Sequence, residues 1–138
     1  MDRTDLLAGL FGSVLVPPAV VRELKQHHAL VPACCELRLM AESERLRRFL
    51  GQADAGEAEA ICLAVESRAD LLLMDDKKGR RLAEAEGVRC LGLPALVLAA
   101  KQKQLIGSVA EFLDLLERRG NFCLASRVRS DLLLQAGE

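Results

Sequence analysis

Apolar positions along the chain change between helical spacing and short continuous runs. The apolar runs at residues 14–16 and 71–74 are typical of buried parallel strands, and we expect strands over residues 14–16, 69–74 and 88–91. Between them, apolar residues recur at the spacing of amphipathic helices. This spacing predicts helices over residues 4–11, 18–25, 44–50, 55–68, 77–86, 94–104, 109–119 and 126–136. Residues 27–40 give no clear pattern, and 37–40 fits either a strand or part of a helix.

The alternation of helices with short apolar strands predicts an α/β fold. Such strands form a parallel sheet covered by helices on both faces, which gives three layers, α/β/α. At 138 residues the chain is long enough for one sizeable core and too short for two ordinary domains. Because we find no internal repeat and no linker, we expect a single domain over residues 1–138.

Composition excludes several classes of protein. Hydrophobic residues make up 51% of the chain, which excludes a disordered polymer. The net charge of −1 argues against a general adhesive for nucleic acid or membranes, but it allows a local basic patch. No apolar run reaches the roughly 18 residues that would span a bilayer. The five cysteines are odd in number and lie mostly in apolar segments, which predicts reduced thiols in the cytoplasm.

The four-residue apolar run 71–74 ends at two aspartates, Asp75 and Asp76. Ligands of open α/β sheets bind where parallel strands end, and carboxylates are the ligands that Mg²⁺ or Mn²⁺ prefers. Asp75 follows the strand directly and is therefore the stronger candidate ligand. The alternative is that one of the two aspartates caps the helix that begins at Lys77, and this does not exclude metal binding by the other.

The predicted helix 55–68 places a third carboxylate near the same edge. At about 100° per residue, its apolar residues share one face: Ala58, Ile61, Cys62 and Val65. Glu57 lies at the border of that face in the first turn, where it can lean over the sheet edge. Glu59 and Glu66 fall on the opposite face and are predicted to be solvated charges. The alternative role for Glu57 is to complement the helix dipole.

A basic cluster begins the next predicted helix, at Lys77, Lys78, Arg80 and Arg81. Positive charge in the first turns opposes the helix dipole, so helix stability does not explain the cluster. Contact with a phosphate chain would explain it, and an ordinary solvated helix face is the alternative.

Zinc is a weaker hypothesis, raised by His27-His28 and Cys34-Cys35. We reject it because adjacent identical ligands suit one tetrahedral ion poorly and the C-x₂-C spacing is absent.

The order of several motifs resembles PIN-domain ribonucleases over nearly the whole chain. The motifs are Gly9-Leu10-Phe11-Gly12, the strand followed by Pro17-Pro18, Val21-Arg22-Glu23-Leu24, Gly56-Glu57-Ala58-Glu59-Ala60-Ile61, the strand ending at Asp75-Asp76, and Arg80-Arg81-Leu82-Ala83. Each motif alone is weak, but their order and spacing together are fairly specific.

The resemblance implies a metal-dependent endoribonuclease that hydrolyses phosphodiester bonds with Mg²⁺ or Mn²⁺, often the toxin of a toxin–antitoxin pair. Carried over by position, Glu23 matches the family's second acid, Glu57 the third and Asp75 the fourth, with Asp76 as a helper. The partners implied are an RNA substrate, an antitoxin protein and a second copy in a homodimer. The apolar stripes of helices 94–104 and 109–119 are predicted to pack in the core, and the alternative is a dimer face or an antitoxin groove.

The chain departs from the family pattern at its start. The family's first acid ends a strand upstream of the Leu-Phe-Gly helix, and no apolar run precedes Asp2 or Asp5. We expect either a trimmed start or a protein that has lost this ligand, with weaker metal binding and slower turnover. Gly92-Leu93-Pro94 also lacks a hydroxyl that the family more often has. Two functions therefore stay open: an active endoribonuclease, or a PIN-like module that binds RNA or protein without catalysis.

A response-regulator receiver also carries an Asp-Asp pair after an apolar strand. In that class the pair lies near the start of the domain, and the 62 residues that follow Asp76 cannot supply the remainder. We therefore reject a receiver.

Overall fold

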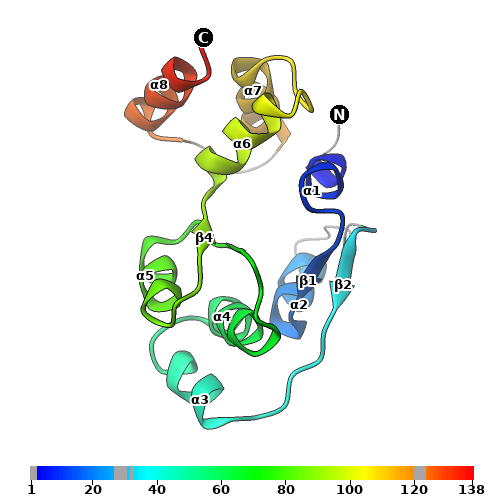
Figure 1. The fold of residues 1–138 in the computed structure, drawn as a ribbon, viewed down its shortest axis with the longest axis vertical. Coiled ribbons are helices and arrows are strands. Elements are labelled where there is room, and N and C mark those ends of the chain that lie inside the picture. The colour runs from blue at the N-terminus through cyan, green and yellow to red at the C-terminus, as the bar shows by residue number, and fades with distance from the viewer. Residues whose placement is uncertain (1–2, 27–30, 32, 120–123) are drawn as a thin grey trace.

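The computed structural model describes residues 3–26, 31, 33–119 and 124–138 (Figure 1). Within these residues helices alternate with short strands. In chain order the elements are α1 Arg3–Phe11, β1 Val14–Val16, α2 Pro18–Gln26, β2 Cys35–Leu37, α3 Glu44–Leu50, α4 Ala55–Ser67, β3 Leu72–Leu73, α5 Lys77–Ala85, β4 Cys90–Leu91, α6 Leu93–Gln102, α7 Val109–Arg119 and α8 Ser126–Gln135. The predicted α/β class is confirmed, and the helix bounds agree with the sequence pattern to within two residues.

Strand β1 has the predicted bounds, whereas β3 and β4 are shorter than the strands predicted over residues 69–74 and 88–91. Of residues 69–74 only Leu72–Leu73 form a strand, because β4 offers only Cys90–Leu91 as a partner. The ambiguous stretch 37–40 is also resolved: β2 ends at Leu37, and residues 38–43 have no regular structure.

Among the described residues the strands form two parallel pairs, β1–β2 and β3–β4, and not the single sheet that we expected. No hydrogen-bonded ladder joins β1 to β3 in this part of the chain. The two pairs are linked instead through α4, which packs against α2 beside one pair and against β3 of the other.

Helix α4 is the centre of one hydrophobic cluster. Ala58, Ile61 and Cys62 on its inner face are fully buried, and they pack with Phe49 of α3 and Met74 beyond β3. The inner face is the one that the helical spacing predicted. This packing fixes the first turn of α4 relative to the segment that carries Asp75 and Asp76.

A second hydrophobic cluster joins α1 to the three C-terminal helices, which lie together at one end of the molecule in Figure 1. Ala100 of α6 and Phe112 and Leu116 of α7 are buried in it, as the predicted core role of those stripes requires. Leu6 of α1, distant in sequence, is buried among them.

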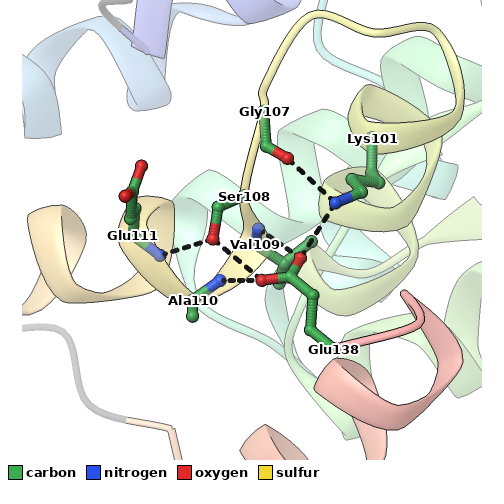
Figure 2. A network of polar contacts seen from close by, with 7 residues as sticks. All are labelled: Lys101, Gly107, Ser108, Val109, Ala110, Glu111 and Glu138. Atoms are coloured by element: carbon green, nitrogen blue, oxygen red, sulfur yellow. Dashed lines mark hydrogen bonds and ion pairs between the residues drawn. The ribbon is translucent and has the colours of Figure 1, made fainter.

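The side chain of Glu138 ties α6, α7 and α8 together (Figure 2). Its carboxylate accepts hydrogen bonds from the backbone N–H of Val109 at 2.7 Å and of Ala110 at 3.2 Å, in the first turn of α7. It also accepts from Ser108 Oγ at 2.8 Å and from Lys101 Nζ at 3.1 Å. These donors, chiefly the Val109 backbone and the Ser108 hydroxyl, lower the pKa of Glu138 to about 2.

Candidate functional site

Glu57 occupies the first turn of α4, where Asp54 is the N-cap. The backbone N–H of Glu57 donates to Asp54 Oδ1 at 2.9 Å, so the cap fixes the position of this turn. Partial burial of Glu57 raises the pKa of its carboxyl group, and the nearby carboxylates of Asp54, Asp76 and Glu23 raise it further. A hydrogen bond from the backbone of Asp54 opposes these effects by lowering the pKa. The charges of three other acids therefore act on Glu57, one from its own cap and two from other elements.

Glu23 reaches this turn from α2. Its carboxylate lies directly over Gly56, so closely that a Cβ atom on Gly56 would lie 2.5 Å from Glu23 Oε1. Gly56 itself is buried, although it is the second residue of the helix. A glycine is needed at this position because only a residue without a side chain lets the carboxylate approach the α4 backbone.

Asp76 and Asp75 face different helices. Asp76 is the N-cap of α5, with Oδ2 accepting from the backbone N–H of Gly79 at 2.8 Å, which confirms the capping role for one of the two aspartates. Asp75 turns the other way and accepts from the backbone N–H of Leu93 at 3.2 Å, at the start of α6. Here too a glycine makes room, because a Cβ atom on Gly92 would lie 3.3 Å from Asp75 Oδ1. Asp76 is the aspartate that acts on Glu57.

The acids approach one another without forming a finished metal site. Among the described residues, no group of three or more acids, histidines or cysteines lies close enough together to hold a metal ion. The charges of Glu23, Asp54 and Asp76 thus act on Glu57, whereas Asp75 accepts a hydrogen bond from the neighbouring helix α6.

The prediction for Glu59 was wrong. Its side chain is only 14% exposed and lies between α4 and α2. Oε1 accepts from the backbone N–H of Ala19 at 2.9 Å, and Oε2 lies 3.5 Å from Nη2 of Arg22. Because Pro18 has no N–H, Ala19 supplies the first donor of α2 that needs an acceptor. The helical wheel could not show this, since a wheel ignores which element packs against the polar face.

Asp54 was missed as a site residue. A signal existed in the sequence, because Asp54 precedes an acid three residues later at the start of a strong helix, the spacing of a capping box. That pattern indicates a helix start, however, and the nearness of Asp76 and Glu23 depends on tertiary packing.

The basic cluster forms one end of α5. Lys77, Lys78 and Arg81 are exposed, and no ion pair between described residues involves them. Arg80 is half-buried, and its Nη1 would lie 3.1 Å from a Cβ atom on Gly92, beside the Asp75 carboxylate. Three exposed cations therefore follow the two aspartates in sequence, and the fourth lies against Gly92, as Asp75 does.

The described cysteines form no disulfide. They are Cys34, Cys35, Cys62 and Cys90. His27 and His28, which raised the zinc hypothesis, lie outside the described residues, as does Cys123.

Residues 1–138 match a family model described as a PIN domain. This chain belongs to the PIN-domain family. The resemblance drawn from the order of the motifs is therefore confirmed over the whole chain, and PIN domains are typically nucleases that use divalent metal ions. Neither a curated protein nor a solved structure matches the chain.

In the described segments of this PIN domain, every helix is too short or too polar to cross a bilayer.

Proposed function

We propose that this PIN domain is a metal-dependent endoribonuclease whose site is the first turn of α4 with the acids around it. The observation that carries the proposal is the half-buried Glu57, whose pKa is raised by burial and by the carboxylates of Asp54, Asp76 and Glu23. Acids that raise one another's pKa are common at functional sites, because stability alone would separate them.

The donors have the chemistry of a Mg²⁺ or Mn²⁺ site, because all are carboxylates. In number they fall short, since no three described side chains converge at ligating distance. Glu23, Glu57 and Asp76 are the residues that would hold the ion, and Asp75 would join them by turning from the Leu93 N–H. A bound ion would supply positive charge beside the scissile phosphate and make a water molecule more acidic.

The residues of α5 supply the other half of the proposed site. Lys77, Lys78 and Arg81 would hold the phosphates of an RNA strand next to the acids, and Arg80 beside Asp75 would extend this contact. Their role in the proposal is to bind and orient the strand, and no base-specific contact is implied.

The experiment uses charge-removing variants that preserve the caps. Asn caps a helix about as well as Asp does, so Asp76→Asn and Asp75→Asn should fold normally. In a fluorogenic RNA assay with Mg²⁺ or Mn²⁺, we expect Asp76→Asn to reduce the cleavage rate by at least about tenfold, since Asp76 is the aspartate near Glu57. The cleavage rate of Asp75→Asn, measured in the same assay, shows how much the second aspartate contributes. Cleavage that neither variant slows, or that persists in chelator, refutes the proposal.

The second candidate function is a PIN-like module that binds RNA or protein without catalysis. The incomplete convergence of the acids favours it. Under this function the wild-type protein binds RNA through α5 in chelator, with an affinity that falls as salt rises, and never cleaves it.

The same proposal includes two protein partners and a cellular location. An antitoxin protein would bind and inhibit the nuclease, a second copy would form a homodimer, and the protein would work in the cytoplasm. Family resemblance and thiol usage support these statements. Co-purification from the native host, with the partner identified by mass spectrometry, tests the antitoxin.

A further inference from the structure

The start of α2 is capped by a side chain from another helix. Pro18 opens α2 without an N–H group, so Ala19 supplies the first N–H of the helix. That N–H donates to Oε1 of Glu59 in α4 at 2.9 Å, and Glu59 therefore does what an N-cap residue does from within its own helix. Its negative charge also suits the positive end of the helix dipole. Because the cap comes from α4, it joins the two helices, which lie side by side in Figure 1.

The same two helices touch again one turn further along, at Glu23 and Gly56. Ala19 and Glu23 are four residues apart on α2, and this pair lies on one face of its helix. Gly56 and Glu59 are three residues apart on α4 and also share a face. The contact moves forwards along α2 from Ala19 to Glu23, while it moves backwards along α4 from Glu59 to Gly56. The helices therefore run in opposite directions at this crossing, and the two contacts fix their register.

The crossing is close and shielded from water. Ala19 and Gly56 are both buried, and the side chain of Glu59 is only 14% exposed. Water therefore competes little for the hydrogen bond to the Ala19 N–H. The second carboxylate oxygen of Glu59 lies 3.5 Å from Nη2 of Arg22, the residue before Glu23. Glu59 thus holds α2 through both of its carboxylate oxygens, within the turn that leads to Glu23.

The position of Glu23 needs this support, because another acid repels it. The charge of Glu23 raises the pKa of Glu57, so the two charged carboxylates disfavour each other. Glu23 is exposed, and no ion pair between described residues involves it. Its position therefore depends on the backbone of α2, and Glu59 fixes that backbone on α4.

We propose that Glu59 is a positioning residue of the acid site, which holds α2 at the register that places the Glu23 carboxylate over Gly56. This role rests on the proposed function, because it concerns the ion that Glu23 and Glu57 would hold. It divides two tasks between the two glutamates of α4. Glu57 would bind the ion, and Glu59 places the helix that brings Glu23 to the site.

The first test measures the Mn²⁺ affinity of the full chain by titration calorimetry. Glu59→Ala removes the acceptor of the Ala19 N–H, and it should weaken Mn²⁺ binding by about tenfold or more, as the loss of a residue that orients a ligand does. Glu59→Gln is the matched control, because it removes the same charge and keeps Oε1 as an acceptor; its Kd should stay within about threefold of the wild type. A Gln variant that binds Mn²⁺ as weakly as the Ala variant overturns the proposal.

A double-mutant cycle separates positioning from a merely structural role. If Glu59 acts through Glu23, then Glu59→Ala should weaken Mn²⁺ binding by less than about threefold in a Glu23→Gln chain, because the residue that it places is no longer a charged ligand. The loss of stability in urea should be the same in both chains. A loss of Mn²⁺ affinity that is equally large with and without Glu23 would show that Glu59 supports the fold alone, and it overturns the proposal.

A measurement without metal distinguishes a failure of this proposal from a failure of the proposed function. In the metal-free wild type, Glu23→Gln should relieve the repulsion by Glu57 and raise the melting temperature by about 1–2 °C. In the Glu59→Ala chain, where Glu23 no longer lies over Gly56, the same change should raise it by less than about 0.5 °C. An equal rise in both chains overturns the proposal. If the wild type binds no Mn²⁺ and this difference persists, the proposed function fails, whereas the placement of Glu23 by Glu59 is supported.

Discussion

Replacing Gly56 by alanine would move Glu23 without removing any acid from the proposed site. The new Cβ atom would lie 2.5 Å from Glu23 Oε1, whereas ordinary contacts begin at 3.4 Å. Glu23 is an exposed side chain with a free end, so its carboxylate can yield. It must yield by about 1 Å, away from the first turn of α4 and from Glu57.

Although Gly56→Ala displaces Glu23, it should stabilise helix α4. Alanine is favoured over glycine inside a helix by up to about 1 kcal/mol, and it also restricts the unfolded chain. We therefore expect Gly56→Ala to leave the melting temperature unchanged or to raise it by about 2–4 °C. A displacement of about 1 Å in a positioned group can cost about a hundredfold in rate, so cleavage should fall between tenfold and a hundredfold.

The assay measures both quantities on the same protein. Thermal unfolding measures the melting temperature. The Mn²⁺ affinity and the RNA cleavage rate show whether the acid site still works. Gly107→Ala is the matched control, because a Cβ atom there meets nothing within 4 Å and neither measurement should change. The reasoning is refuted if Gly56→Ala keeps full Mn²⁺ affinity and cleavage. It is equally refuted if the variant loses stability in proportion to activity, since the effect would then be one of packing.

Three further predictions concern carboxylates that differ in what stabilises them. Because the pKa of Glu57 is raised in the folded protein, its charge destabilises the fold above pH 4.5. Glu57→Gln should therefore raise the melting temperature at pH 7. This gain should vanish as the pH falls below 4.5. Glu138 has a lowered pKa of about 2, so Glu138→Gln should lower the melting temperature at pH 7, and the difference from wild type should shrink between pH 4.5 and 2. A pH-independent difference would contradict either assignment. Glu59→Ala removes the acceptor of the Ala19 N–H and should reduce the free energy of unfolding by about 1 kcal/mol in urea titrations. Glu66→Ala on the same helix removes only the acceptor of a weak thiol donor, Cys62, and should change it less.

Local patterns predicted the helices well because each helix satisfies its backbone within its own segment. The end of α5 is an example, since Gly87 adopts φ +79°, a left-handed conformation that favours glycine, and it stops the helix where the sequence indicated. Strands depend on partners elsewhere in the chain. The sequence predicted a strand over residues 69–74, but only Leu72–Leu73 pair with a partner, the two residues of β4.

The site divides in the same way. The helical spacing of α4 placed Glu57 correctly at the border of the apolar face, and half-burial follows from that position. It could not show that Gly56 receives Glu23, that Asp54 completes the acid group, or that Asp75 turns to α6. These features depend on the tertiary packing of α2, α4, α5 and α6, which no single segment of the sequence predicts.

The most direct test of the account is RNA cleavage by the wild-type chain and by Glu57→Gln, each with Mn²⁺ and with EDTA. The account predicts cleavage by the wild type that requires the metal, and a loss of at least about a hundredfold in a variant that is as stable as the wild type or more so. Equal cleavage by both proteins, or a wild type that binds RNA and leaves it intact at every Mn²⁺ concentration, would contradict it.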